Sequence, residues 1–248
     1  MKRNDFFNKY NIHSSYFDFF TQERINTISK FINKLKKSGN FAPKEHSIFR
    51  ALENDLQNSK VLILGKDPYF QPGAATGIAF EVNGLNNWQS PFKQRSLQNI
   101  IRVIYQTYTD KKYIFSNIRK EIDSSYFEIL PPNKLFQSWH NQDVILLNSF
   151  LTVKIENGKN TSGSHEKQWN NFTKELLTYI STKNPNINYF LWGAHSNSFA
   201  KNIINGNIYS SNHPSMAFGK SKKDFLFFNG FKETKNIVNW TGISKKRE

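Results

Sequence analysis

The sequence predicts an α/β protein with three α/β/α layers around a short, parallel, four-stranded central sheet. Three short apolar runs carry most of this prediction, at residues 60–65, 144–148 and 187–193. Runs that are apolar at nearly every position are typical of parallel strands covered on both faces. Segments with helical spacing separate these runs, and this alternation favours a parallel sheet with helices on both sides.

The predicted elements follow in chain order. Residues 25–35 place Ile, Phe and Leu on one helical face and basic residues on the other, and Gly39-Asn40 ends the segment. Residues 47–56 are expected to form a short helix before the first strand. The remaining expected elements are the first strand at 60–65, a helix over 97–107, the strand 144–148, a helix over 169–182, the strand 187–193 and a shorter fourth strand near 208–209.

A single domain over residues 1–248 is expected, because no linker, repeat or low-complexity tract divides the chain. Residues 110–133 are polar and irregular, and they form either an inserted loop or short helices. The terminal Lys-Lys-Arg-Glu is expected to be frayed. A hydrophobic content of 38% and an aromatic content of 15% exclude disorder over most of the chain.

The chain is strongly basic. It has 34 Lys and Arg against 19 Asp and Glu, a formal net charge of +15 and a pI near 9.8. Such a charge indicates a polyanionic partner: nucleic acid, an anionic membrane or an acidic protein. Compositional drift toward Asn, Lys and Ile would produce the same charge without selection for binding, so charge alone leaves both explanations open.

Several classes of protein are excluded by pattern. The absence of Cys excludes disulfides, Cys-ligated zinc and thiol nucleophiles. No apolar run approaches the roughly 20 residues of a membrane-spanning helix, and residues 1–10 lack the apolar core of a signal peptide. We therefore expect a cytoplasmic protein with no membrane partner.

Three common enzyme motifs are also missing. Gly65-Lys66 lacks the upstream glycine and the following Ser or Thr of a phosphate-binding loop. His165-Glu166 has no second His four residues on, and no Gly-x-Ser-x-Gly elbow is present. The sequence therefore predicts no metal and no cofactor.

Polar residues follow the predicted strands where each one ends. Asp67 lies just after the first strand, Asn148 ends the second and His213 follows the fourth. Ligands of parallel α/β sheets bind beyond the carboxyl ends of the strands. We therefore expect these three side chains to converge on one pocket.

A set of motifs in this order and spacing resembles the family 1 uracil-DNA glycosylases. The resemblance runs from about residue 40 to residue 240, and it implies a protein that flips uracil out of DNA and hydrolyses its bond to deoxyribose. The matching motifs are Gly65-Lys66-Asp67-Pro68-Tyr69, Pro72-Gly73, Gly77-Ile78-Ala79-Phe80, Leu146-Leu147-Asn148, Leu151-Thr152-Val153, Leu191-Trp192-Gly193 and His213-Pro214-Ser215.

The resemblance implies a role for each pocket residue. Asp67 would stabilise a cationic sugar and orient water, and His213 would donate to the oxygen of the departing uracil anion. Asn148 would pair with the uracil edge and exclude cytosine. Phe80 would stack on the flipped base, and Tyr69 would fill the space that a thymine methyl needs.

Each of these residues also has an ordinary structural explanation when it is taken alone. Asp67 before Pro68 caps a turn, Phe80 packs in a core, Asn148 satisfies loop backbone and His213 is a loop histidine. Their common order and context favour the pocket.

The pocket motif departs from the family pattern at two positions. The family has Gly-Gln-Asp-Pro-Tyr-His, whereas Lys66 and Phe70 replace the Gln and the His here. The backbone amide of Lys66 is still expected to bind uracil or water. Its side chain can pair with a phosphate or with Asp67, and the second pairing would compete with catalysis. Phe70 removes a polar group that helps to organise the site and its water.

The loops that grip the DNA backbone in the family depart further. Ser96 is kept, but the prolines that precede it in the family are replaced by Gln94-Arg95. Gly193-Ala194 has lost one hydroxyl of the family's Gly-Ser loop, and Ser215 of the third loop is kept. We expect these residues to contact DNA more weakly than their family counterparts.

The segment after Ser215 shows the largest departure. The family has His-Pro-Ser-Pro-Leu, whose leucine fills the gap left by the flipped base. Here the segment is Met216-Ala217-Phe218. Ala217 is too short for this role, whereas Met216 and Phe218 are wedges of the kind found elsewhere.

Two hypotheses about function follow from this combination of motifs. The first is a monomeric glycosylase with weak activity on duplex DNA and a preference for single strands, since a single strand leaves no gap to fill. The alternative is a catalytically impaired relative that binds an acidic, DNA-mimicking inhibitor protein as its partner or decoy. The net charge suits both hypotheses.

Overall fold

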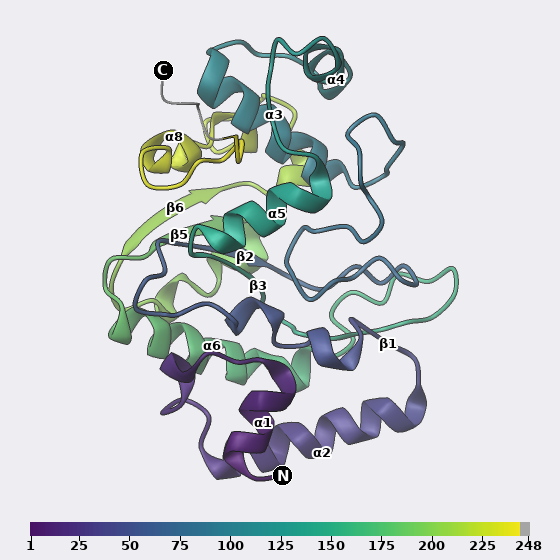
Figure 1. Ribbon diagram of the computed structural model, residues 1–248, viewed down its shortest axis with the longest axis vertical. Coiled ribbons are helices and arrows are strands. Elements are labelled where there is room, and N and C mark those ends of the chain that lie inside the picture. The colour runs from purple at the N-terminus through teal and green to yellow at the C-terminus, as the bar shows by residue number, and fades with distance from the viewer. Residues whose placement is uncertain (244–248) are drawn as a thin grey trace.

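The computed structural model, which describes residues 1–243, has the predicted three-layer architecture (Figure 1). Its central sheet contains four parallel strands in the order β3-β2-β5-β6. The α/β class and the parallel four-stranded sheet are therefore confirmed. The terminal Lys-Lys-Arg-Glu lies outside the described residues. The strands are β2 (Val61–Gly65), β3 (Val144–Asn148), β5 (Asn188–Trp192) and β6 (Asn207–Ser211).

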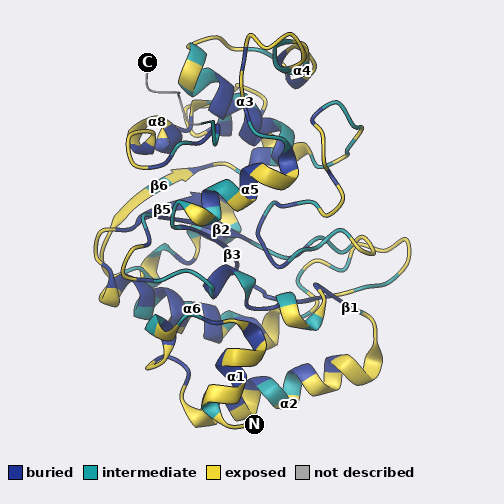
Figure 2. Ribbon diagram, in the orientation of Figure 1, coloured by how far each residue is buried: buried dark blue, intermediate teal, exposed yellow. Residues whose placement is uncertain are grey.

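Strand β2 is buried on both faces, as its continuous apolar run predicts. Leu62 and Leu64 belong to one hydrophobic cluster, and Val61 and Ile63 belong to the other. Alternate side chains of a strand point to opposite faces, so one run supplies both cores. Figure 2 shows the helices with their buried faces toward the sheet and their exposed faces outward.

Helices cover the sheet on both sides (Figure 1). The first layer contains α1 (Arg3–Tyr10), α2 (Gln22–Ser38) and α6 (Glu166–Lys183), and the second contains α3 (Arg95–Thr109), α5 (Pro132–Asn141) and α8 (Gly230–Thr234). Helices α2, α3 and α6 each extend a predicted helix by a few residues, whereas α1, α5 and α8 are additional. None of the described helices is long and apolar enough to cross a membrane.

Local sequence explains the ends of α2. The Thr21 side chain accepts a hydrogen bond from the backbone N–H of Arg24 and caps the first turn. At the other end Gly39 takes a left-handed conformation with φ 67°, and its N–H donates to the carbonyl of Leu35. The helix therefore ends at the glycine where the sequence predicts its end.

Residues 47–56 do not form the predicted helix. The 3₁₀ turn η3 (Arg50–Leu52) lies within this range instead, and another 3₁₀ turn, η2 (Glu45–Ser47), ends at its first residue. The carbonyl of Leu52, which a continuing helix would use, accepts a hydrogen bond of 2.9 Å from the N–H of His13. A tertiary contact thus replaces the helical bond.

Residues 110–133 contain short helical structure, which was one of the two alternatives. Asp110 takes a left-handed conformation with φ 57° and ends α3. Helix α4 (Phe115–Asp123) follows, and Phe115 and Ile118 are buried in the second cluster. The segment therefore contributes to a hydrophobic core although it is polar overall.

The remaining elements are short. Strands β1 (Phe41–Ala42) and β4 (Val153–Lys154) pair antiparallel in a separate two-stranded sheet. The other short helices and turns are α7 (Gly193–Asn197), η1 (Ser14–Tyr16), η4 (Ala200–Asn202), η5 (Pro214–Met216) and η6 (Phe225–Phe227).

Candidate active site at the carboxyl ends of the strands

A pocket of about 460 Å³ opens beyond the carboxyl ends of β2 and β3. Eight residues singled out from the sequence line it, and they come from segments far apart in the chain. These residues are Lys66, Asp67, Tyr69, Phe80, Ser96, Asn148, His213 and Ser215. The pocket also contains Gly65, Pro68, Phe70, Asn160 and Ser162.

Asn148 owes its position to the glycine beside it. Gly65 and Asn148 are register partners at the ends of β2 and β3. A Cβ atom on residue 65 would lie 2.4 Å from Oδ1 of Asn148, closer than any real contact. Only glycine at this position leaves room for the amide, which is buried and lines the pocket.

The carboxylate of Asp67 is held by the loop that follows β4. Oδ2 accepts a hydrogen bond of 2.5 Å from the Ser162 hydroxyl. The backbone N–H of Gly163 donates to the same carboxylate, at 3.1 Å from Oδ1 and 3.2 Å from Oδ2. The side chain is only 7% exposed. These donors hold the carboxylate in a position where little water reaches it.

Lys66 makes only a marginal ion pair with Asp67. Its Nζ lies 4.0 Å from Oδ2, at the limit for such a pair, and the lysine side chain remains partly exposed. The expected competition for the carboxylate is therefore weak in this geometry. The carbonyl of Lys66 accepts from the backbone N–H of Phe150 and from the hydroxyl of Ser149, and these bonds fix the turn after β2.

His213 is oriented by the residue two positions later. Its Nδ1 accepts from the backbone N–H of Ser215 at 3.2 Å and lies 2.8 Å from the Ser215 hydroxyl. Burial lowers the pKa of His213, so the imidazole is neutral near pH 7. Because Nδ1 is an acceptor from a backbone amide, the proton of the neutral ring resides on Nε2.

Gly193 packs closely against the same histidine. Its φ is +87°, and a Cβ atom there would lie 2.9 Å from the Cβ of His213. The glycine therefore provides both the backbone conformation and the close approach. Its neighbour Ala194 is exposed at the start of α7 and does not line the pocket.

Two aromatic residues line the pocket near the turn after β2. The backbone of Phe80 has a φ of 67°, an uncommon conformation for a residue with a side chain. Its ring packs 5.3 Å from that of Trp192. The Tyr69 hydroxyl donates to the Phe80 carbonyl at 3.5 Å, and burial raises the pKa of Tyr69. The phenol therefore remains protonated and directed at the backbone.

The side chains of the segment after Ser215 differ in exposure. Met216 and Phe218 are 57% and 55% exposed, whereas Ala217 is 9% exposed. None of the three lines the pocket of about 460 Å³, but Ala217 and Phe218 line a neighbouring one. Ala217 faces inward, and the two large apolar side chains project from the surface.

Sequence motifs did not identify three residues that shape the site. Asn160 and Ser162 enter the pocket from the loop after β4, where the only signal is the small polar run 160–164. Asp224 accepts from the backbone N–H groups of Phe218 and Gly219 and holds the exposed segment in place. Burial favours the protonated acid, but the backbone donors outweigh it and lower the pKa of Asp224.

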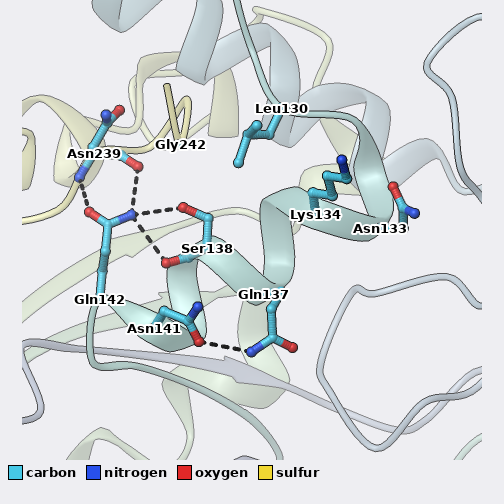
Figure 3. Close-up of a pocket in the computed structure, with 9 residues that line it drawn as sticks. All are labelled: Leu130, Asn133, Lys134, Gln137, Ser138, Asn141, Gln142, Asn239 and Gly242. Atoms are coloured by element: carbon cyan, nitrogen blue, oxygen red, sulfur yellow. Dashed lines mark hydrogen bonds between the residues drawn. The ribbon is translucent and has the colours of Figure 1, made fainter. Parts of the chain in front are cut away.

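A larger hollow of about 560 Å³ lies elsewhere, between α5 and the end of the described chain (Figure 3). Gln142 donates to the backbone carbonyls of Ser138 and Asn239, and Gln137 donates to Asn141. The polar groups that line this hollow thus largely hydrogen-bond to one another. Lys134 is the one charged residue among the described residues of the lining. Within residues 1–243, no group of three or more His, Cys, Asp or Glu residues could hold a metal ion.

The family model described as "Uracil DNA glycosylase superfamily" matches residues 53–236. This match covers more than half of the chain, including the strands and loops that form the pocket. The chain belongs to this superfamily. The matched range includes all the residues that line the pocket of about 460 Å³.

Individual relatives agree with this assignment. A uracil-DNA glycosylase of Bacillus cereus (strain G9842) is 30% identical over 200 residues, which cover 79% of this chain and 77% of the relative. The crystal structure of mimivirus uracil-DNA glycosylase has the same fold, with a TM-score of 0.66 at 23% identity over 96% of this chain and 86% of that one. A mimivirus UNG variant in complex with UGI matches with a TM-score of 0.60 at 26% identity, over 83% and 72% of the two chains.

Proposed function

We propose that this superfamily member hydrolyses the bond between uracil and deoxyribose in DNA. The convergence of Asp67, Asn148 and His213 on one pocket carries the proposal. These residues offer a carboxylate, an amide and a neutral imidazole, which are the groups needed at the sugar, the base edge and the leaving oxygen. The pocket volume of about 460 Å³ accommodates one flipped nucleotide.

Asp67 acts at the sugar. As the bond between C1′ and the uracil nitrogen breaks, its electron pair leaves with the base and the sugar becomes cationic. A carboxylate that is 7% exposed stabilises that cation more strongly than one in bulk water. Asp67 orients a water that then bonds to C1′, and the proton lost from this water balances the charge of the departing uracil anion.

His213 acts at the base. The departing uracil carries negative charge on its oxygen, and the Nε2–H of the neutral ring can donate to that oxygen. Ser215 holds the ring through Nδ1, so the donor is in place before the charge develops. A donor fixed in advance lowers the barrier without reorganisation during the reaction.

Specificity comes from the amide and the aromatic walls. The Asn148 amide can accept from the uracil N3–H and donate to O4, whereas cytosine presents an acceptor and a donor at those positions. Phe80 supports the face of the base, and Tyr69 occupies the space of a thymine methyl. The backbone amide of Lys66 adds a donor that does not depend on its side chain.

We infer a preference for single-stranded DNA. Ala217 is inward-facing, so no residue at that position fills the gap in a duplex, and Ala194 provides no hydroxyl for a phosphate. Each loss costs roughly 1–3 kcal/mol, or about ten- to a hundredfold in rate. Ser96 and Ser215 remain as backbone contacts for either strand form.

Release of free uracil tests the proposal. Matched single- and double-stranded oligonucleotides are incubated with the protein at low salt, because phosphate binding is salt-sensitive. We expect release from both and faster release from the single strand. A cytosine-containing strand is the specificity control. No uracil from either substrate would contradict the proposed activity.

A second candidate function is the binding of an acidic, DNA-mimicking inhibitor protein. It is favoured by the net charge of +15 and by the match to a mimivirus UNG variant in complex with UGI. Titration with UGI tests it. A stable complex together with no uracil release would support a binding protein or decoy, whereas the absence of a complex contradicts this candidate. Size-exclusion chromatography of the free chain tests the expected monomer.

A further inference from the structure

We propose that a second pocket, beside the proposed uracil pocket, binds a phosphate of the DNA strand that carries the flipped nucleotide. It has a volume of about 430 Å³ and lies between α3, α4 and the segment after His213. Arg95, Arg102 and Arg119 line it. The inference rests on the proposed function only in taking DNA as the ligand.

Arginine is scarce in this chain, which makes the cluster informative. The sequence has seven arginines against 27 lysines, and six of the arginines lie in the described part. Three of these six line one pocket. Compositional drift toward lysine does not explain such a gathering. The guanidinium group presents a planar fork of donors that matches phosphate oxygens in pairs.

The other described arginines already have partners for their charge. Arg24 pairs with Glu175, Arg50 pairs with Glu81, and Arg3 lies over the ring of Phe17. In contrast, no ion pair within residues 1–243 involves an arginine of the cluster, and no carboxylate lines the pocket. Three positive charges therefore face one hollow whose described lining contains no carboxylate.

Arg102 is fixed by neutral acceptors. Its Nε donates to the carbonyl of Tyr113 at 3.1 Å and its Nη1 donates to Oδ1 of Asn99 at 2.8 Å. Burial lowers the pKa of Arg102, and the charge of nearby Asp224 opposes this effect. A bound anion would offset the desolvation of this charge.

Arg119 and Arg95 complete the cluster in different ways. Arg119 donates through Nη2 to the carbonyl of Gln89, while its Nε is buried without a hydrogen-bond partner among the described residues. Arg95 is exposed in the first turn of α3. The cluster thus combines two anchored guanidinium groups with one that is free to close on a ligand.

The two pockets share a wall. Ser96 lines the uracil pocket, and its neighbour Arg95 lines the arginine pocket. Asn99, which holds Arg102, also donates to the carbonyl of Pro214 at 2.6 Å, directly after His213. A DNA strand whose flipped nucleotide occupies the uracil pocket would therefore pass the arginine pocket.

The surroundings favour DNA over an acidic protein. Phe218 and Ile114 line the arginine pocket and are 55% and 58% exposed. Exposed aromatic surface beside arginines suits a base next to its phosphate, since bases stack on such side chains. Carboxylates would satisfy the charge but would leave this apolar surface uncovered.

Salt-dependent binding of a short single-stranded oligonucleotide without uracil tests the proposal. Arg95→Gln and Arg95→Gln/Arg119→Gln are compared with Lys30→Gln/Lys34→Gln, which removes two charges from α2 at the opposite end of the molecule (Figure 1). Removing one charge that neutralises a phosphate lowers the slope of log K against log salt by about 0.7. We expect this reduction, with roughly three- to tenfold weaker binding, for Arg95→Gln, and a larger effect for the double variant.

The possible results distinguish the phosphate site from a protein-binding surface and from the glycosylase proposal. Equal slopes and affinities for the arginine and lysine variants would overturn the phosphate site. So would variants that bind DNA normally but fail to bind UGI, since the pocket would then be a protein-binding surface. The oligonucleotide contains no uracil, so failure of the glycosylase proposal does not affect this test. Arg95→Gln alters only an exposed side chain and remains informative if the double variant unfolds.

Discussion

The Ser162 hydroxyl donates a hydrogen bond of 2.5 Å to Oδ2 of Asp67. This contact joins the loop after β4 to the proposed catalytic carboxylate. It places a polar group beside Asp67 in a chain where Phe70 replaces a polar family residue. We infer that Ser162 helps to hold the carboxylate at the sugar.

Replacing Ser162 by Ala therefore lowers the rate of uracil release. Loss of one hydrogen bond to a charged group costs about 1.5–3 kcal/mol, so we expect a reduction of roughly ten- to a hundredfold under single-turnover conditions. We expect binding of the uracil-containing oligonucleotide to change little, because the Ser162 hydroxyl is already engaged with Asp67. Ser162→Thr keeps the hydroxyl and retains most of the rate. An alanine variant as fast as the wild type would show that the contact is incidental.

Gly65→Ala should abolish recognition through steric conflict with the amide of Asn148. The added Cβ would lie 2.4 Å from Oδ1, so the amide must leave its position. We expect a loss of uracil release of about a hundredfold or more. Gly84→Ala is a matched control, since its Cβ meets nothing within 4 Å although φ is +77°. It costs about 1 kcal/mol of stability and preserves activity. Full activity in Gly65→Ala would remove Asn148 from the mechanism.

Phe218→Ala is expected to slow uracil release from duplex DNA more than release from single-stranded DNA. Its side chain is 55% exposed next to the inward-facing Ala217, so it can fill a gap in a duplex. We expect roughly a tenfold loss on duplex DNA and a smaller loss on a single strand. The ratio of the two rates is the measurement. The same experiment on Met216→Ala shows which of the two side chains fills the gap in the duplex. If the ratio of duplex to single-strand rates is unchanged in both variants, neither side chain has this role.

Stability should fall on mild acidification. Burial is the largest cause that lowers the pKa of His140, His165, His195 and His213. The unfolded chain therefore binds more protons than the folded one below the ordinary histidine pKa of about 6.5, and the free energy of unfolding decreases as the pH falls. Urea unfolding at about pH 7.5 and about pH 6 measures this change. Equal or greater stability at the lower pH would contradict it.

Much of the fold could be predicted from the sequence because β2, β3 and β5 are buried on both faces. Such strands require a covered parallel sheet, and that sheet brings Asp67, Asn148 and His213 to one edge. The prediction failed over residues 47–56, where the N–H of His13 takes the carbonyl of Leu52. Local periodicity carries no information about such a long-range competitor.

The missed parts of the site depend on contacts between distant segments. Ser162 reaches Asp67 across 95 positions of sequence, and nothing in a small polar run indicates this partner. The arginine cluster likewise joins α3 to α4, and α4 lies in residues 110–133, for which the sequence left an inserted loop and short helices as alternatives. Motifs reveal residues that a family shares, whereas these residues become visible only when the fold brings them together.

The most direct test of the account is the single-turnover rate of uracil release from a single-stranded oligonucleotide by the wild type, Asp67→Asn and His213→Ala. Loss of the carboxylate is expected to reduce the rate by on the order of a thousandfold, and loss of the imidazole by about a hundredfold or more. The Asp67→Asn protein, purified in parallel, also measures any contaminating host enzyme. Release by the wild type that disappears in Asp67→Asn is the predicted result. Equal release by all three proteins would contradict the roles assigned to this pocket.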